Sequence, residues 1–128
     1  AMFDAKEIDL SQYEAESSFH DATGAGRGYA CAGGVAEAIE KCINEYYPDV
    51  EVSIEHAEGL AECKKTLTLA KAGRLNGCLI EGMGCPGGCI AGAGTNIPVL
   101  KAKKDLAAYV KNSTTPIPPK ELEEIELE

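Results

Sequence analysis

Two cysteines, Cys85 and Cys89, are the residues in this chain best suited to chemistry, and they bracket a Pro-Gly-Gly turn within the glycine-rich stretch 81–95. Glycine has no Cβ and tolerates positive φ, so this stretch allows the backbone to approach a bulky group closely. Iron–sulfur clusters are bound by thiolates and tuned by hydrogen bonds to their sulfurs. The pattern therefore predicts an iron–sulfur site, and its structural alternative is a tight turn with two buried small residues.

The spacing of the two cysteines limits which types of metal site they could form. A Cys-x3-Cys spacing differs from the Cys-x2-Cys of zinc ribbons and of thioredoxin-like redox sites, which disfavours both. The exposed amides of a glycine-rich turn supply positive potential, which stabilises the thiolate form that iron needs. Pro86 biases Cys85 toward an extended backbone, which separates the two thiols at the start of the loop.

Two segments of the chain resemble the catalytic domain of the iron-only ([FeFe]) hydrogenases. Residues 81–95 resemble the last cluster-binding segment of that family, a Met-x-Cys-Pro-Gly-Gly-Cys run followed by further glycines. Residues 21–38 look like the family's glycine-rich loop and the start of the helix that follows it. The order and separation of the two segments also fit. The resemblance covers roughly residues 19–109 and points to the C-terminal part of such a domain.

The resemblance implies a role for each residue of these segments. Cys85 would bind a [4Fe–4S] cubane, and Cys89 would bridge that cubane to a di-iron subsite where protons and H2 interconvert. Met83 would lie beside the di-iron subsite, although hydrophobic packing at a strand end is its structural alternative. Four glycines would let the backbone close over the cofactor: Gly33, Gly34, Gly87 and Gly88.

Departures from the family pattern indicate a fragment. The family uses four cluster cysteines, and the motifs that carry the other two have no counterpart in this chain. Ala30-Cys31-Ala32 also replaces a set that is smaller or hydroxyl-bearing in many members, and this departure favours a divergent, sensory or regulatory branch of the family. We therefore expect the chain to be inactive and without cofactor by itself, and to need the N-terminal remainder of the domain and an electron carrier such as ferredoxin. The alternative is a non-catalytic iron–sulfur binding or sensing module with the same fold.

Length and charge exclude other classes of function. The chain has 128 residues, which is the size of one domain, and 21 acidic against 12 basic residues give a formal net charge of −9. This balance disfavours a nucleic-acid partner. No segment is predicted to span a membrane, no signal segment opens the chain, and six cysteines without a signal are typical of reduced thiols in a cytoplasmic protein.

Apolar periodicity and turn residues predict an α/β fold. The order is a helix, a strand, a helix, a strand and a helix, at about 34–47, 50–56, 60–72, 78–82 and 98–111. The two strands should be parallel with a right-handed crossover, so the cluster-binding loop would follow the carboxyl end of the sheet. We expect a domain at 19–111, flanked by a mobile N-terminal arm (1–18) and a disordered Pro-rich and acidic tail (112–128).

The same periodicity assigns faces to the elements. Leu60, Cys63, Leu67 and Ala70 are predicted to form the buried face of the second helix. His56 is predicted to be a buried histidine on the inward face of its strand rather than a ligand. The cysteines outside the loop are predicted to be buried, in the core or beside the glycine loop: Cys31, Cys42, Cys63 and Cys78.

Overall fold

A computed structural model of the 128-residue chain describes residues 2–14 and 22–120. The helices and strands occur in the order α1 (Met2–Ala5), η1 (Leu10–Gln12), α2 (Gly24–Arg27), η2 (Gly28–Ala30), α3 (Gly34–Tyr46), β1 (Ser53–Glu58), α4 (Leu60–Lys71), β2 (Cys78–Met83), η3 (Cys89–Ala91) and α5 (Val99–Lys111).

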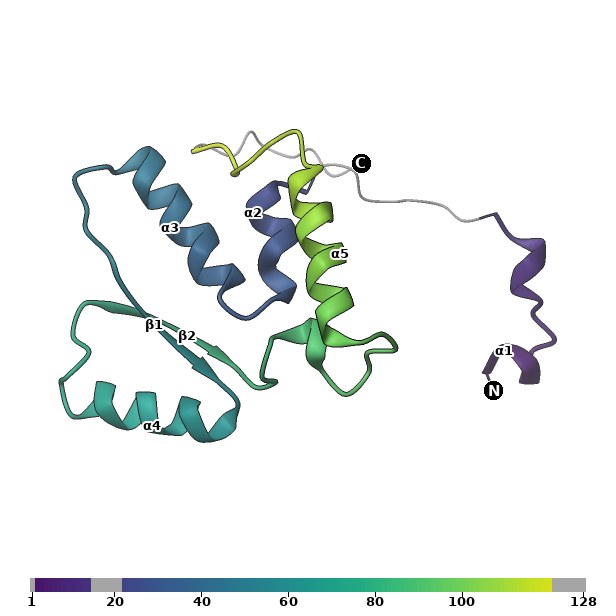
Figure 1. Cartoon of the computed structure of the whole chain (residues 1–128), viewed down its shortest axis with the longest axis horizontal. Helices are drawn as coiled ribbons and strands as arrows, with labels where there is room; N and C mark the ends of the chain where they lie inside the picture. Colours follow the sequence, from purple (N-terminus) through teal and green to yellow (C-terminus); the bar gives the residue numbers. More distant parts are fainter. Residues whose placement is uncertain (1, 15–21, 121–128) are drawn as a thin grey trace.

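The centre of the fold is a βαβ unit. β1 and β2 pair in parallel, with Ser53 opposite Cys78 at one end and Glu58 opposite Met83 at the other. Helix α4 connects the strands and packs on both of them, while α3 contacts β2, and Figure 1 shows the strands lying between α4 and α3. Helices α2 and α5 contact each other beside α3. The prediction of an α/β fold with parallel strands flanked by helices is confirmed.

Most predicted boundaries agree with the structure. The two helices predicted at 34–47 and 60–72 end one residue earlier than expected, where Tyr47 and Ala72 are the C-caps. Pro98 is the N-cap of α5 and not its first helical residue. The first strand begins at Ser53 and not at Val50, because its partner strand begins opposite Ser53 at Cys78.

The buried core consists of small side chains. No large side chain is fully buried among the described residues, and the apolar residues that are buried are all alanines: Ala25, Ala36, Ala38, Ala57 and Ala102. The cysteines predicted to be buried, Cys31, Cys42, Cys63 and Cys78, are all half-buried. Many larger apolar side chains therefore lie on surfaces that the described residues do not cover.

The predicted buried face of α4 is wrong in part. Leu60 and Leu67 are 78% and 61% exposed, whereas Thr66 is buried. Cys63 faces the sheet as predicted, and its Sγ lies 3.6 Å from the carbonyl oxygen of Ala57. Residues 63, 66 and 70 recur on one side of a helix just as 60, 63, 67 and 70 do, so the periodicity alone did not decide which stripe meets the strands.

A segment that follows α5 contacts helices α2 and α3. Residues 113–118, here called the return segment, belong to the region predicted to be a disordered tail, but they hydrogen-bond to α2 and α3. Thr115 and Pro116 accept hydrogen bonds from the amides of Gly24 and Ala25, both at 2.8 Å. The hydroxyl of Tyr46 donates to the carbonyl of Pro118 at 2.7 Å. The return segment therefore satisfies backbone donors at the start of α2.

The structure describes part of each of the two predicted flanking regions. α1 and η1 fall within the predicted N-terminal arm and contain no buried residues. Residues 15–18 of that arm and 121–128 of the predicted tail lie outside the described residues. None of the helices in the described part of the chain is long and apolar enough to cross a membrane.

Candidate functional site

The two loop cysteines lie just beyond the carboxyl end of β2. All six cysteines are free, but only these two are exposed, whereas the other four are half-buried. The backbone turns between them, because the amide of Gly88 donates to the carbonyl of Cys85 at 3.0 Å, and Cys89 then begins η3. A Cβ at Gly92 would lie 3.6 Å from the Sγ of Cys85, so a glycine at this position leaves space beside that sulfur.

Gly87, at the centre of this turn, is fixed from two sides. Its amide donates to Oε2 of Glu58 at 2.7 Å, and its carbonyl accepts from the amide of Ala32 at 3.2 Å. Its φ is +90°, in the left-handed region that glycine adopts at low cost. The cysteine loop is therefore attached both to the end of β1 and to the glycine-rich loop before α3.

Gly88 lies where the cysteine segment 81–95 directly contacts the glycine-rich segment 21–38. A Cβ at Gly88 would collide with the amide nitrogen of Ala32, and would lie 2.6 Å from the carbonyl oxygen of Ala30 and 2.7 Å from the carbonyl carbon of Cys31. A Cβ at Gly34 would likewise collide with the carbonyl oxygen of Gly28. These two glycines thus allow close backbone contacts within the chain, and that requirement exists without any cofactor.

A buried carboxylate occupies the N-terminus of α3. The N-cap, Gly33, has no side chain to offer, and instead Oε1 of Glu81 on β2 accepts from the amide of Val35 at 3.0 Å. Oε2 of Glu81 lies 3.1 Å from Nδ1 of His56, its neighbour across the sheet. The side chain of Glu81 is 7% exposed and that of His56 is 51% exposed. The prediction of a buried His56 is therefore wrong, because the ring contacts Glu81 from the solvent side.

Sequence reasoning did not identify Glu81 or Glu58 as part of this region. Glu81 follows the apolar run 78–80 within a strand, and a charge in that position needs a partner. That signal was available in the sequence. Glu58 ends β1 and is exposed, as is Glu55 on the same strand, so its sequence environment did not distinguish it.

Met83 lies at the end of β2 and is half-buried. It borders a cavity of about 330 Å³ between α3 and β2, which Val35, Ile39 and Leu79 also line. Its carbonyl accepts from the amide of Gly59 at 2.7 Å. This environment is the strand-end packing given above as the structural alternative, and a role of Met83 beside a di-iron subsite stays a prediction.

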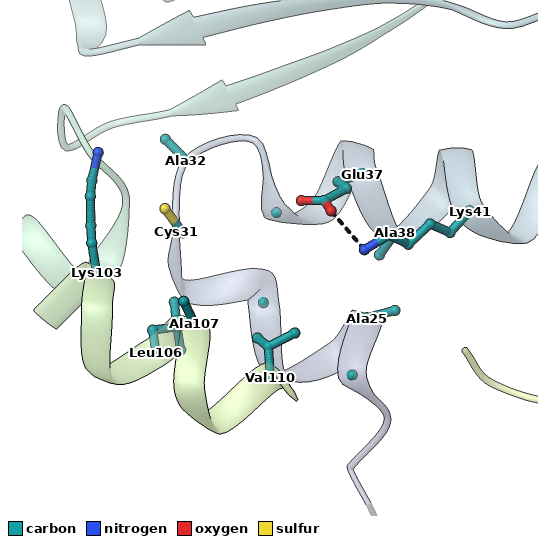
Figure 2. A pocket seen from close by; sticks show the side chains of 13 residues that line it. Ala25, Cys31, Ala32, Glu37, Ala38, Lys41, Lys103, Leu106, Ala107 and Val110 are labelled. Carbon is teal, nitrogen blue, oxygen red and sulfur yellow. Dashed lines mark ion pairs between the residues drawn. The ribbon is translucent and has the colours of Figure 1, made fainter. Parts of the chain in front are cut away.

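A second cavity, of about 280 Å³, lies between α2, α3 and α5 (Figure 2). Cys31 lines it together with Lys103, and Glu37 and Lys41 form an ion pair of 2.6 Å at one side (Figure 2). Neither cysteine of the loop lines this cavity. Both loop cysteines are exposed residues at the surface of the described part of the chain.

The loop offers part of a ligand set. No three histidine, cysteine, aspartate or glutamate side chains converge on a possible metal position within residues 2–14 and 22–120. A [4Fe–4S] cluster takes four thiolates. The two exposed cysteines therefore fit two of the four ligand positions of such a cluster.

Comparisons with known proteins identify the family. A search of curated proteins found no significant match to this chain. The family model described as the C-terminal domain of the iron-only hydrogenase large subunit matches residues 1–93. This match includes the glycine-rich loop, the βαβ unit and both cysteines of the loop, and it ends before α5. The chain therefore belongs to the family formed by the C-terminal domains of iron-only hydrogenase large subunits.

Proposed function

We propose that Cys85 and Cys89 supply two thiolates to the cluster of an iron-only hydrogenase, and that the N-terminal remainder of the same domain supplies the other ligands. Cys85 would hold the [4Fe–4S] cubane, and Cys89 would hold the part of the cofactor where the cubane meets the di-iron subsite. When bound, this cluster interconverts protons, electrons and H2, and a carrier such as ferredoxin exchanges the electrons. We expect the isolated chain to have no hydrogenase activity and to retain no cofactor, because the described residues bring no third ligand to the two thiols and a cubane takes four.

The observation that carries this proposal is the pair of free, exposed thiols on a loop whose backbone is held in place. Gly87 is hydrogen-bonded on both sides, and Gly88 is packed against the backbone of residues 30–32. A loop fixed in this way holds its two sulfurs in a defined arrangement before any iron arrives, which favours binding of a rigid cluster.

Two features close to the cysteine loop also support a cluster position beside Cys85 and Cys89. The cavity between α3 and β2 extends along the strand to Met83 at its carboxyl end, and open α/β folds bind their ligands beyond that end of the sheet. The glycine-rich loop that precedes α3 contacts the cysteine loop directly through Ala32 and Gly87. The backbones of Gly33 and Gly34 are placed near the cluster on this proposal.

The test is a set of four variants in the intact parent protein, with iron per chain and the reduced-state electron paramagnetic resonance signal as the measurements. Cys85→Ser and Cys89→Ser should each remove cluster iron and the signal. Cys42→Ala and Cys63→Ala are the matched controls, because these half-buried thiols lie on helices. The controls should lose only packing, on the order of 1 kcal/mol of stability, and keep normal iron.

The outcomes separate the possible functions. Full iron and signal in the Cys85 and Cys89 variants would contradict the proposal. Cluster binding without H2 turnover in the intact parent would favour the non-catalytic sensing module over the hydrogenase.

A further inference from the structure

A carboxylate holds the turn between the two proposed cluster thiols. Glu58 is the last residue of β1, and its Oε2 accepts from the amide of Gly87 at 2.7 Å. A hydrogen bond to an ionised carboxylate is shorter and stronger than one between neutral groups. The backbone amide of Glu58 donates in turn to Oε2 of Glu62 at 3.1 Å, which ties the strand end to the first turn of α4.

Other contacts set the distance between the strand end and the loop. The amide of Gly59 donates to the carbonyl of Met83 at 2.7 Å, so the ends of β1 and β2 stay together. The ring of Pro86 packs near Gly59, where a Cβ would lie 3.5 Å from Cγ of the proline. The carboxylate of Glu58 therefore reaches the Pro86–Gly87 peptide from a position that the sheet determines.

This hydrogen bond has an electrostatic consequence for a group bound by the two thiols. Amides that point to cluster sulfurs stabilise added negative charge and raise the reduction potential. The Gly87 amide is directed to Glu58 and is not available for a sulfur. The carboxylate also places negative charge next to the loop. Both effects favour the oxidised cluster.

We propose that Glu58 is a positioning residue of the cysteine loop, which fixes the peptide between Cys85 and Cys89 and holds a negative charge beside the cluster that they bind. The part of the proposal that concerns the charge rests on the proposed function. The part that concerns the loop does not, because the hydrogen bond exists in the metal-free chain.

The first experiment measures hydrogen exchange of the Gly87 amide by NMR in the metal-free chain. Glu58→Ala removes the acceptor and should speed the exchange about tenfold or more, whereas Glu58→Gln keeps an acceptor oxygen and should have a smaller effect. Glu55→Ala is the matched control, because the Glu55 side chain is exposed on the same strand and has no partner among the described residues. It should leave the exchange unchanged.

The second experiment measures the midpoint reduction potential of the cluster in the intact parent. Glu58→Gln should shift the potential to a more positive value while iron per chain stays normal, and Glu55→Ala should shift it less or not at all. A purely structural role of Glu58 would not move the potential in a variant that binds iron normally, so this readout separates the two roles.

Unchanged Gly87 exchange in the Glu58→Ala chain, or an unchanged potential in the Glu58→Gln protein, overturns the proposal. Failure of the proposed function is recognised separately, because the Cys85→Ser and Cys89→Ser proteins would then keep their iron. The exchange experiment would still decide whether Glu58 positions the loop.

Discussion

Replacing Gly88 by alanine tests whether the contact between the two glycine-rich segments holds the fold together. Gly88 is buried and has a φ of +89°. Its missing Cβ would collide with the amide nitrogen of Ala32 and lie 2.6 Å from the carbonyl oxygen of Ala30. These neighbours are backbone atoms, so no side chain can rotate away to make room.

The expected loss of stability has two parts. An alanine at positive φ costs about 1–2 kcal/mol. Inserting a methyl group into a closely packed position costs about another 1–3 kcal/mol. The sum is about 2–5 kcal/mol, and a natural domain has a total stability of about 5–15 kcal/mol. Because the buried apolar core is made of alanines, we place the stability of this chain near the lower end of that range. The Gly88→Ala chain should therefore unfold at a lower temperature and at a lower urea concentration than the unchanged chain.

Two other glycines separate these contributions. Gly77 also has positive φ, +78°, but a Cβ there would meet nothing within 4 Å, so Gly77→Ala should cost only the conformational part. Gly94 has neither a positive φ nor a neighbour within 4 Å, so Gly94→Ala should change stability by less than about 0.5 kcal/mol. Urea unfolding of the metal-free chain, followed by circular dichroism, measures all three variants.

The order of the three variants is the decisive result. We expect Gly88→Ala to be the least stable, Gly77→Ala to be intermediate and Gly94→Ala to resemble the unchanged chain. If Gly88→Ala proves as stable as Gly77→Ala, the close backbone contact contributes nothing to stability, and the proposed joining of the two segments through Gly88 is refuted.

Two further predictions concern carboxylates. Glu81→Ala should destabilise the metal-free chain by about 2 kcal/mol in urea unfolding, because it leaves the Val35 amide without its acceptor at the start of α3, and a loss under about 0.5 kcal/mol would contradict this role. The pKa of Asp9 lies below its usual value of 3.8, because the hydroxyl and then the amide of Ser11 donate to it. Stabilisation from these bonds is therefore present above pH 3.8 and is lost as the pH falls through the lowered pKa. In an NMR titration Ser11→Ala should raise the pKa of Asp9, and an unchanged value would refute this cause.

The helices and strands could be predicted because their signals are local. Apolar spacing, together with Pro48 and Pro98, predicted the ends of α3 and α5 to within one residue. The start of β1 was not predictable in the same way, because it depends on where the other strand begins opposite Ser53. The buried face of α4 was not predictable either, because Leu67 and Thr66 lie on adjacent stripes and only the position of the strands decides between them.

The candidate site was predictable only in outline. The cysteine loop follows β2 directly, so its place at the carboxyl end of the sheet could be inferred from chain order. Glu58 and Glu81 reach backbone amides 29 and 46 residues away, at Gly87 and Val35. Such long-range side-chain contacts leave no periodic pattern in the sequence, so they can be identified only from the folded arrangement of the strands and loops.

The hydrogen bonds of the return segment have a consequence for the order in which the chain folds. The partners His56 and Glu81 in the sheet are 25 residues apart, whereas Ser113 hydrogen-bonds to Ala22 across 91 residues. Closing the longer loop costs about 1 kcal/mol more in chain entropy. During synthesis the βαβ unit can form before the return segment exists, whereas the amides of Gly24 and Ala25 obtain their acceptors only once Thr115 and Pro116 have been made. The first turn of α2 therefore becomes fixed later than the sheet.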